Sequence, residues 1–365
     1  MRPSRCRARS KSWGNDRSRK CDDASGAARR PAANDAESLY AWRVARPLAR
    51  FLSALQLVRL SLALGAVGEL WFAVLLARAD PQAAGLAVSM MPLPEALGIA
   101  TIVAIGLYSF GASLNDVLDL RHDSAFSPER PIPSGKIRSA HAVMVAMTSL
   151  MVAVSGAVLF GQSALLTTVV IAAVILFFNA AGKHFPAVGL LVVGMVHAGH
   201  MLIPDQRPAT MLPAWLAMVH AVAVRAVVHR LEEKRPALTA RSILALLLLV
   251  VGASVMLLSR GGDADARARL HAPALTSLLW PVASVALFVI VAWAKTRRVP
   301  STTAAEKLLR YGSLWQVVHG VAWMAMLGEW SAAGWLALLA LGGFATMTIL
   351  RESASLVLRP PEYRP

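Results

Sequence analysis

The sequence predicts an all-α protein, a polytopic bundle of nine to ten transmembrane helices. Two observations support this fold class. The 365-residue chain is 56% hydrophobic, with a mean hydropathy of +0.54, and both values are high for a soluble domain. The apolar residues also gather in stretches close to the roughly 17–25 residues that cross a bilayer as a helix. These stretches lack the period-two alternation of a membrane β-barrel.

Ten such stretches follow one another along most of the chain. Two of them, 188–204 and 311–329, are short and contain histidine, so nine spans is the alternative to ten. The ten expected spans cover residues 57–77, 97–118, 139–160, 163–182, 188–204, 212–229, 241–259, 274–294, 311–329 and 333–350.

The basic residues fall unevenly between the loops that join these spans. If the N-terminus lies in the cytoplasm, thirty Lys and Arg residues fall on the cytoplasmic side and five on the other. Positive charge marks cytoplasmic loops, so we expect an integral protein of the cell (inner) membrane with a cytoplasmic N-terminus. This split explains the net charge of +16 through topology, so membrane lipids are expected partners and nucleic acid is not.

The chain divides by composition into three parts. Residues 1–50 carry thirteen Lys and Arg residues and few apolar ones, which predicts a disordered basic N-terminal arm. The alternative is a start codon assigned too far upstream. Residues 51–351 form the transmembrane domain, and residues 352–365 form a short cytoplasmic tail. Cys6 and Cys21 both lie in the arm, without the spacing of a metal site.

A set of aspartates follows the second expected span. Asp116, Asp119 and Asp123 are spaced i, i+3 and i+7, so on a helix they share one face, with Asn115 at its edge. Three neighbouring carboxylates repel one another unless a cation lies between them. Oxygen ligands suit Mg²⁺, which completes its shell with waters and phosphates. The pattern therefore predicts Mg²⁺ and a diphosphate at a wet membrane boundary; the alternative is a solvated acidic turn.

The residues after the aspartates predict a loop, because prolines at 128, 131 and 133 interrupt a helix and Gly135 permits a turn. The string NDVLDLRHDSAFSPERPIPSGKI resembles the first aspartate-rich signature of the UbiA-type intramembrane prenyltransferase superfamily. That signature is Asn-Asp-x-x-Asp-x-x-x-Asp followed by Pro-x-Arg-Pro-Ile/Leu-x-x-Gly. The resemblance extends over about residues 55–350.

The resemblance implies a helical bundle around a lipid-open cavity. In the family, Mg²⁺ held by the aspartates binds an isoprenyl diphosphate, the diphosphate leaves, and an acceptor captures the allylic cation. The catalytic residues implied here are Asp116, Asp119, Asp123 and Lys183, with Asn115 and Arg130 in substrate binding. Lys183 lies where the family has a lysine, and its point charge suits a leaving diphosphate. Its alternative role is that of a lysine ending a cytoplasmic helix.

The second family signature is altered in this chain. The segment 228–236 contains no aspartate, but Glu232 and Glu233 could bind metal in its place, and some family branches carry an Arg/Glu-rich sequence there. Arg225 and Arg230 are expected to bind the diphosphate. The alternative for the whole segment is a charged cytoplasmic turn.

Other polar residues lie in or beside the expected spans. Arg59 opens the first span and is a substrate-binding candidate, with snorkelling to the interface as its alternative. Ionisable residues inside a membrane are candidate functional residues. Glu69 is expected to contribute only polarity, whereas His197 and His200, spaced i and i+3, could line the cavity. The single histidines at 220 and 319 are expected to be satisfied within the bundle.

These observations predict an Mg²⁺-dependent prenyltransferase that transfers an isoprenyl group from an isoprenyl diphosphate to an aromatic or lipid acceptor. Two alternatives stay open. One is a terpene-cyclase-like enzyme that uses the same aspartates without an acceptor. The other is a non-catalytic homologue acting as a lipid carrier or assembly factor, which the altered second signature favours and the intact first signature opposes.

Overall fold

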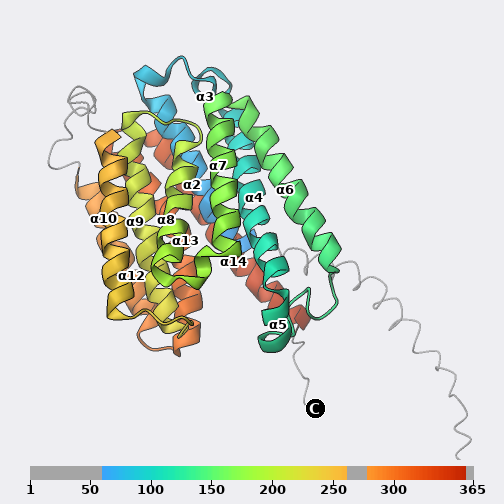
Figure 1. The fold of residues 1–365 in the computed structure, drawn as a ribbon. Helices are drawn as coiled ribbons and strands as arrows, with labels where there is room; N and C mark the ends of the chain where they lie inside the picture. The colour runs from blue at the N-terminus through green and yellow to red at the C-terminus, as the bar shows by residue number, and fades with distance from the viewer. Residues whose placement is uncertain (1–59, 261–277, 359–365) are drawn as a thin grey trace, which may run out of the picture. The chain divides into compact units, whose positions relative to one another are not determined.

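The structure, a computed structural model, describes residues 60–260 and 278–358. Every regular element in these ranges is a helix, as the hydropathy predicts (Figure 1). The basic arm, Arg59 and the end of the tail lie outside the described residues. The elements are α2 (Leu60–Ala79), η1 (Pro81–Ala83), α3 (Ala87–Met90), α4 (Leu93–Leu118), α5 (Leu120–Phe126), α6 (Ser139–Leu159), α7 (Gln162–Ala180), η2 (Gly182–His184), α8 (Pro186–Leu202), α9 (Pro208–Leu231), α10 (Ala240–Arg260), α12 (Leu279–Thr296), α13 (Ser301–Met326) and α14 (Trp330–Leu358).

A long helix occupies the position of each predicted span. Seven of these helices, α4, α6, α7, α9, α10, α12 and α14, are long and apolar enough to cross a membrane, and α8 is apolar but shorter. The number of spans, nine or ten, therefore stays a prediction. Helix α13 begins at Ser301 rather than near residue 311, because its charged first turns are helical but not apolar. Hydropathy detects the membrane-embedded part of a helix and misses such turns.

Proline and glycine set several helix boundaries. Helices α4, α8 and α9 carry proline in their first turn, where no backbone N–H is needed for the helix. Gly161 ends the turn between α6 and α7 with φ +106°, and Gly328 separates α13 from α14 with φ +79°. This left-handed backbone favours glycine, and the resulting short connections return each helix antiparallel to the one before it.

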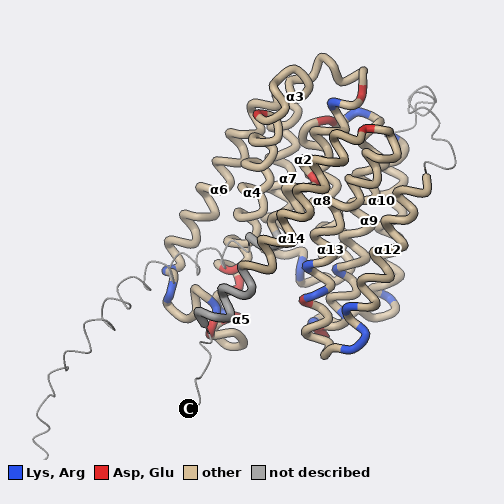
Figure 2. The backbone as a smooth tube through the Cα atoms, turned by 180° about the vertical axis from the view of Figure 1, so that it is seen from behind, with Lys and Arg blue, Asp and Glu red and all other residues tan. Residues whose placement is uncertain are grey.

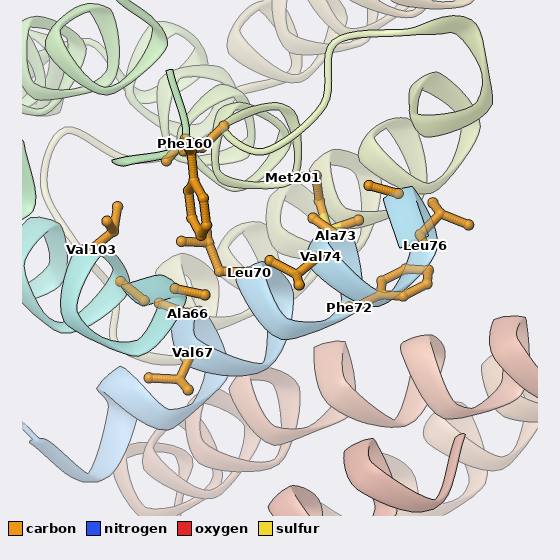
Figure 3. Close-up of a cluster of buried hydrophobic side chains, with 14 of the residues drawn as sticks. Ala66, Val67, Leu70, Phe72, Ala73, Val74, Leu76, Val103, Phe160 and Met201 are labelled. Atoms are coloured by element: carbon orange, nitrogen blue, oxygen red, sulfur yellow. The ribbon is translucent and has the colours of Figure 1, made fainter. Parts of the chain in front are cut away.

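Helix α2 lies at the centre of the bundle and contacts α4, α8, α9, α13 and α14. Its Leu70 and Val74 are completely buried, and Figure 3 shows Val103, Phe160 and Met201 from neighbouring elements gathered around it. Helices α10 and α12 lie at the periphery and expose many leucines and valines. Such apolar exposed faces suit contact with lipid rather than water.

Helices α4 and α6 approach each other through small residues. A Cβ atom on Gly106 would lie 2.7 Å from the carbonyl oxygen of Ser149 and 2.8 Å from Cβ of Ala153. A Cβ atom on Gly156 would lie 2.8 Å from Val103 Cγ2. Close backbone approach at small residues is typical of membrane helices. This contact fixes α4 against α6, and the loop that joins them through α5 carries much of the first signature.

Charged residues gather at the two ends of the bundle (Figure 2). Helix α5, the loop that follows it and the connection between α9 and α10 all lie at the lower end in Figure 1. The segments expected to form the site therefore share one end of the bundle, as the distribution of basic residues predicts.

Two arginines form hydrogen bonds and ion pairs at the opposite end of the bundle. Arg78 donates hydrogen bonds to the carbonyl oxygens of Val88 and Met91 at 2.9 and 2.8 Å. Arg207 forms a two-pronged pair with Asp205, at 2.9 and 2.8 Å, and also contacts Asp80 at 3.3 Å. The hydrogen bonds from Asp205 raise the pKa of the Arg207 guanidinium, so this cation stays charged at every physiological pH.

The α4–α6 contact gives a first prediction. Gly106→Ala should lower the free energy of unfolding by about 1–3 kcal/mol, the usual cost of overpacking, although alanine is the better helix former. Gly98→Ala is the matched control in the same helix, where a Cβ atom meets no neighbour; it should be neutral or slightly stabilising. Thermal unfolding in detergent measures both. Equal behaviour of the two variants would contradict the close approach.

The arrangement of the two ends gives a second prediction. In a variant without Cys6 and Cys21, cysteines introduced at Ser134 and Ala237 should be labelled by a membrane-impermeant reagent from the same side, the cytoplasm. A cysteine at Ala84, an exposed residue near the opposite end, should be labelled only from the other side. Labelling of Ser134→Cys and Ala237→Cys from opposite sides would contradict the shared-end arrangement.

Candidate functional site

The aspartates of the first signature straddle the junction of two helices. Asp116 lies in the last turn of α4 and Asp123 in α5, while Asp119 occupies the junction with φ −87° and ψ 3°. Helical hydrogen bonds cross the junction, from Asp119 N to Asn115 O at 2.9 Å and from Asp123 N to Asp119 O at 2.8 Å. The predicted stripe is thus present, with a break at Asp119.

The burial of these carboxylates differs from the expectation of a wet boundary. Asp116 and Asp123 are only 5% and 3% exposed, whereas the Asp119 side chain is a quarter exposed. Buried carboxylates need a cation or several hydrogen bonds. Two of the three carboxylates at the expected membrane boundary are therefore shielded from water, and only Asp119 is partly exposed.

Arg130 supplies a positive charge to the two buried carboxylates. Its Nη1 donates to Asp123 Oδ2 at 2.6 Å and lies 3.9 Å from Asp116 Oδ1. Turns in the loop place it there: Arg130 N donates to Ser127 O, and Ile137 N donates to Pro131 O. Ile132 anchors the loop by packing against Ala142 and residues of α4 and α5. The proline-rich loop therefore folds back and places the Arg130 guanidinium beside the aspartates that precede it in the sequence.

Lys183 pairs with the remaining aspartate, Asp119, through direct contact between Nζ and Oδ1. The lysine lies in η2, just after α7 ends, and 64 residues separate it from its partner. Gly189 keeps η2 in place, since a Cβ atom there would lie 2.9 Å from Gly182 O. The structure thus brings together the lysine and the aspartates that the sequence analysis assigned to one site.

Two asparagines accompany these ion pairs. Asn115 Nδ2 lies 3.4 Å from Asp116 Oδ1, close enough for a long hydrogen bond to that carboxylate. Asn179, near the end of α7, is 4% exposed and donates from Nδ2 to Ile175 O at 2.9 Å. Its Oδ1 is buried and has no hydrogen-bond partner among the described residues.

The second charged segment does not join the aspartates through any hydrogen bond or ion pair of Glu232 or Glu233 in the described ranges. Glu232 pairs instead with Lys234 at 2.7 Å, and Glu233 is exposed with φ +50°. Arg230 is exposed in the last turn of α9, and Arg225 lies half-buried further back in the same helix. The segment therefore lies at the expected end of the bundle but forms its own charged turn.

Whether the residues suit Mg²⁺ depends on their chemistry and on the cation already beside them. No three His, Cys, Asp or Glu side chains in the described ranges come close enough to hold a metal together. Asp116 and Asp123 do converge on one guanidinium, which shows that a cation can lie between them. Mg²⁺ needs only one or two carboxylates when waters and phosphates complete its shell. The donor set fits on this basis.

A second buried polar cluster lies in the middle of the bundle. Glu69 of α2 is 1% exposed, and its carboxylate accepts hydrogen bonds from His197 Nδ1 and from His200 Nδ1, the latter at 3.1 Å. From the sequence, Glu69 and the pair of histidines were expected to act separately. The sequence shows two histidines spaced i and i+3 and a glutamate in another span. It does not show that α2 packs against α8, which is what brings them together.

Histidines 220 and 319 form a separate, closed chain of hydrogen bonds. His220 Nε2 lies 2.9 Å from the carbonyl oxygen of Gly312, which can only accept, so this nitrogen carries the proton. His220 Nδ1 is then free to accept from His319 Nε2 at 3.1 Å, and His319 Nδ1 accepts from Ser284 Oγ at 2.9 Å. Each imidazole is satisfied within the bundle, as predicted.

Comparison with known proteins places this geometry in context. No protein-family model matches the chain. A stretch of 138 residues is 27% identical to digeranylgeranylglyceryl phosphate synthase of Methanopyrus kandleri, covering 37% of this chain and 51% of that protein. The chain thus spans about half the length of this curated relative.

Two solved structures are similar to the chain. One is reported for digeranylgeranylglyceryl phosphate synthase in membranes; it is 17% identical, covers 76% of this chain and 99% of its own, and superimposes with a TM-score of 0.53. The other is a UbiA homologue from Aeropyrum pernix K1, 16% identical, covering 72% and 97%, with a TM-score of 0.48. The first structure establishes a shared fold.

The central cluster gives a third prediction. Glu69→Leu removes the acceptor of two imidazole N–H groups and should lower the free energy of unfolding by about 3–5 kcal/mol. Adding His197→Leu and His200→Leu should recover much of that loss, because the unpaired polar groups disappear. Glu95→Leu, at an exposed position of α4, is the control. Denaturation in detergent measures all three, and purely additive losses would contradict a coupled cluster.

Proposed function

We propose that this chain, which has the UbiA-type fold, is an intramembrane prenyltransferase that transfers an isoprenyl group from an isoprenyl diphosphate to a lipid or aromatic acceptor. The expected resemblance of the chain to the UbiA-type superfamily is supported by the 27% identical segment and by the shared fold. The observation that carries the proposal is the meeting of Asp116, Asp119 and Asp123 with Arg130 and Lys183 at one end of a membrane bundle.

Asp116, Asp119 and Asp123 are the residues proposed to hold Mg²⁺, with Asn115 supporting Asp116. When bound, the metal would offset the negative charge that develops on the departing diphosphate. Helices α4 and α5 hold these carboxylates at fixed positions, so little reorganisation is needed when the charge develops. Such preorganised electrostatic stabilisation is usually the largest contribution to catalysis.

Arg130 and Lys183 are proposed to bind the diphosphate oxygens. The planar guanidinium of Arg130 can contact two oxygens at once, whereas the ammonium of Lys183 acts as a point charge. Arg225 and Arg230, on the last two turns of α9 at the same end of the bundle, remain candidates for steering the anion toward the site. The low exposure of Asp116 and Asp123 limits the access of water, which would otherwise compete with the acceptor for the allylic cation.

The name of the matched relative, digeranylgeranylglyceryl phosphate synthase, supports a lipid acceptor over an aromatic one. It also makes geranylgeranyl diphosphate the first donor to test. The lipid-facing apolar surfaces of α6, α7, α10 and α12 are consistent with substrates that arrive through the bilayer.

A second candidate function is a non-catalytic lipid carrier. The observation that favours it is that Glu232 pairs with Lys234 and Glu233 is exposed, so neither glutamate joins the aspartates. The assay of the next prediction separates the two functions, because a carrier has no use for a metal-dependent diphosphate site.

The fourth prediction tests the site directly. Wild-type protein in detergent should be stabilised against heat by geranylgeranyl diphosphate only when Mg²⁺ is present. Asp116→Ala and Asp119→Ala should abolish this stabilisation, because the metal loses a ligand. Glu129→Ala is the control, since Glu129 is an exposed acid of the same loop and no role is proposed for it.

The unliganded variants should also be less stable. Asp119→Ala leaves Lys183 without its partner, which should cost about 1 kcal/mol for a partly exposed pair. Absence of metal-dependent stabilisation of the wild type by any isoprenyl diphosphate would favour the carrier. Stabilisation that persists in Asp119→Ala would show that the site lies elsewhere.

A further inference from the structure

We infer that Arg130 and Lys183 are built-in counter-ions that compete with the divalent metal for the aspartates until a diphosphate draws them away. This inference rests on the proposed function and concerns how its site is loaded. The two ion pairs of the site, Arg130 with Asp123 and Asp116, and Lys183 with Asp119, carry the argument.

The first step is the pairing itself. Each cation proposed to bind the diphosphate contacts a carboxylate proposed to bind the metal. Among the described residues, neither Arg130 nor Lys183 forms another side-chain hydrogen bond or ion pair. The metal and the two basic side chains therefore compete for the same carboxylate oxygen atoms.

The second step is burial. The side chains of Asp116 and Asp123 are 8% and 4% exposed, and that of Lys183 is 19% exposed. Charges shielded from water interact more strongly than surface pairs, and removing one partner leaves the other desolvated and uncompensated. A metal ion that arrives alone must displace a basic side chain and leave it without a counter-charge, so the metal alone should bind weakly.

The third step is the charge balance. Three carboxylates face two basic groups, and a dication alone would leave this set of groups with excess positive charge. A metal that arrives together with a diphosphate allows an exchange of partners, in which carboxylates take the metal and phosphate oxygens take the arginine and lysine. After this exchange both basic side chains again contact an anion and the metal contacts carboxylates and phosphate oxygens, so metal and diphosphate should bind cooperatively.

The fourth step is the placement of the groups that must move. The acids lie on α4, on α5 and at the junction between them, whereas Arg130 lies in the loop after α5 and Lys183 in the short η2 segment. Loops and long basic side chains can change rotamer at small cost, but a helix cannot shift independently of its packing. Because Gly189 packs on η2, Lys183 is expected to exchange partners through its side chain alone.

This inference predicts an effect on Mg²⁺ affinity that a simple substrate-binding lysine would not produce. Lys183→Met should bind Mg²⁺ alone roughly threefold to tenfold more tightly than the wild type, because a competing cation of partly buried character is gone. The same variant should bind inorganic pyrophosphate more weakly, because a phosphate ligand is gone. A lysine that only binds phosphate would leave the affinity for Mg²⁺ alone unchanged.

The experiment is isothermal titration calorimetry on the full-length protein in detergent, with Mg²⁺ alone, pyrophosphate alone, and each in the presence of the other. Lys183→Arg should behave as the wild type because it keeps the charge. Lys136→Met is the matched control, since Lys136 is an exposed lysine of the same cytoplasmic end without an ion pair in the described residues. The Mg²⁺–pyrophosphate complex that forms in solution contributes equally to the titrations of Lys136→Met and Lys183→Met, so the comparison of the two variants removes its effect.

Arg130→Met provides a second test, with thermal unfolding to show that it folds. It too should tighten Mg²⁺ binding in the absence of pyrophosphate and reduce the reciprocal coupling between the two ligands. Unchanged or weaker Mg²⁺ binding by folded Lys183→Met would overturn the counter-ion role, and the proposed function would stand if the wild type binds Mg²⁺ and pyrophosphate together. Failure of wild type and variants alike to bind either ligand would overturn both.

Discussion

A backbone amide inside a lipid bilayer must find its hydrogen-bond partner within the protein, because hydrocarbon offers none. In this chain the requirement is met by helices throughout the described ranges, and most Lys, Arg, Asp and Glu side chains in these ranges lie toward the two ends of the bundle. Chemistry that needs charge is therefore confined to helix ends and short connections. The aspartates and their basic partners occupy such a place, at the end of α4, on α5, in the loop that follows it and in η2.

Rigid packing behind these connections gives the site its geometry. Close approach of α4 to α6 at Gly106 and of α8 to η2 at Gly189 fixes the helices from which the acids and Lys183 project. The close contacts at Gly106 and Gly189 thus influence the positions at which the aspartates and Lys183 meet, although these glycines lie outside the site. Substituting them should displace the site even though no glycine contacts a ligand.

Part of this arrangement could be predicted from the sequence, because local spacing determines it. The i, i+3, i+7 pattern placed Asp116 and Asp123 on one side of the chain, and the prolines after Ser127 predicted the loop that returns Arg130. The break at Asp119 and the burial of its neighbours depend on the packing of whole helices, which spacing does not encode. The expected partnership of Glu232 and Glu233 with the aspartates came from family resemblance, and the altered residue types there form a different local turn.

Contacts between residues far apart in the sequence were harder to predict. Nothing local to Glu69 indicates that His197, 128 residues away, contacts its carboxylate. Whether α2 lies against α8 is decided by how all the helices fit together, so a single buried acid could be noticed in the sequence but not assigned a partner. Lys183 and Asp119 are also far apart in the sequence, by 64 residues, and only the family resemblance joined them before the structure did.

The hydrogen-bonded chain from Ser284 through the two histidines to Gly312 has a consequence for the energetics of the surrounding membrane. Imidazoles linked in series can relay protons, and a relay that crossed the bilayer would dissipate a proton gradient. Here the chain links α12, α13 and α9 and stops at a peptide carbonyl, a group too weakly basic to accept a proton and pass it on. Buried histidines can thus stabilise the packing of α9, α12 and α13 while the protein remains impermeable to protons along this route.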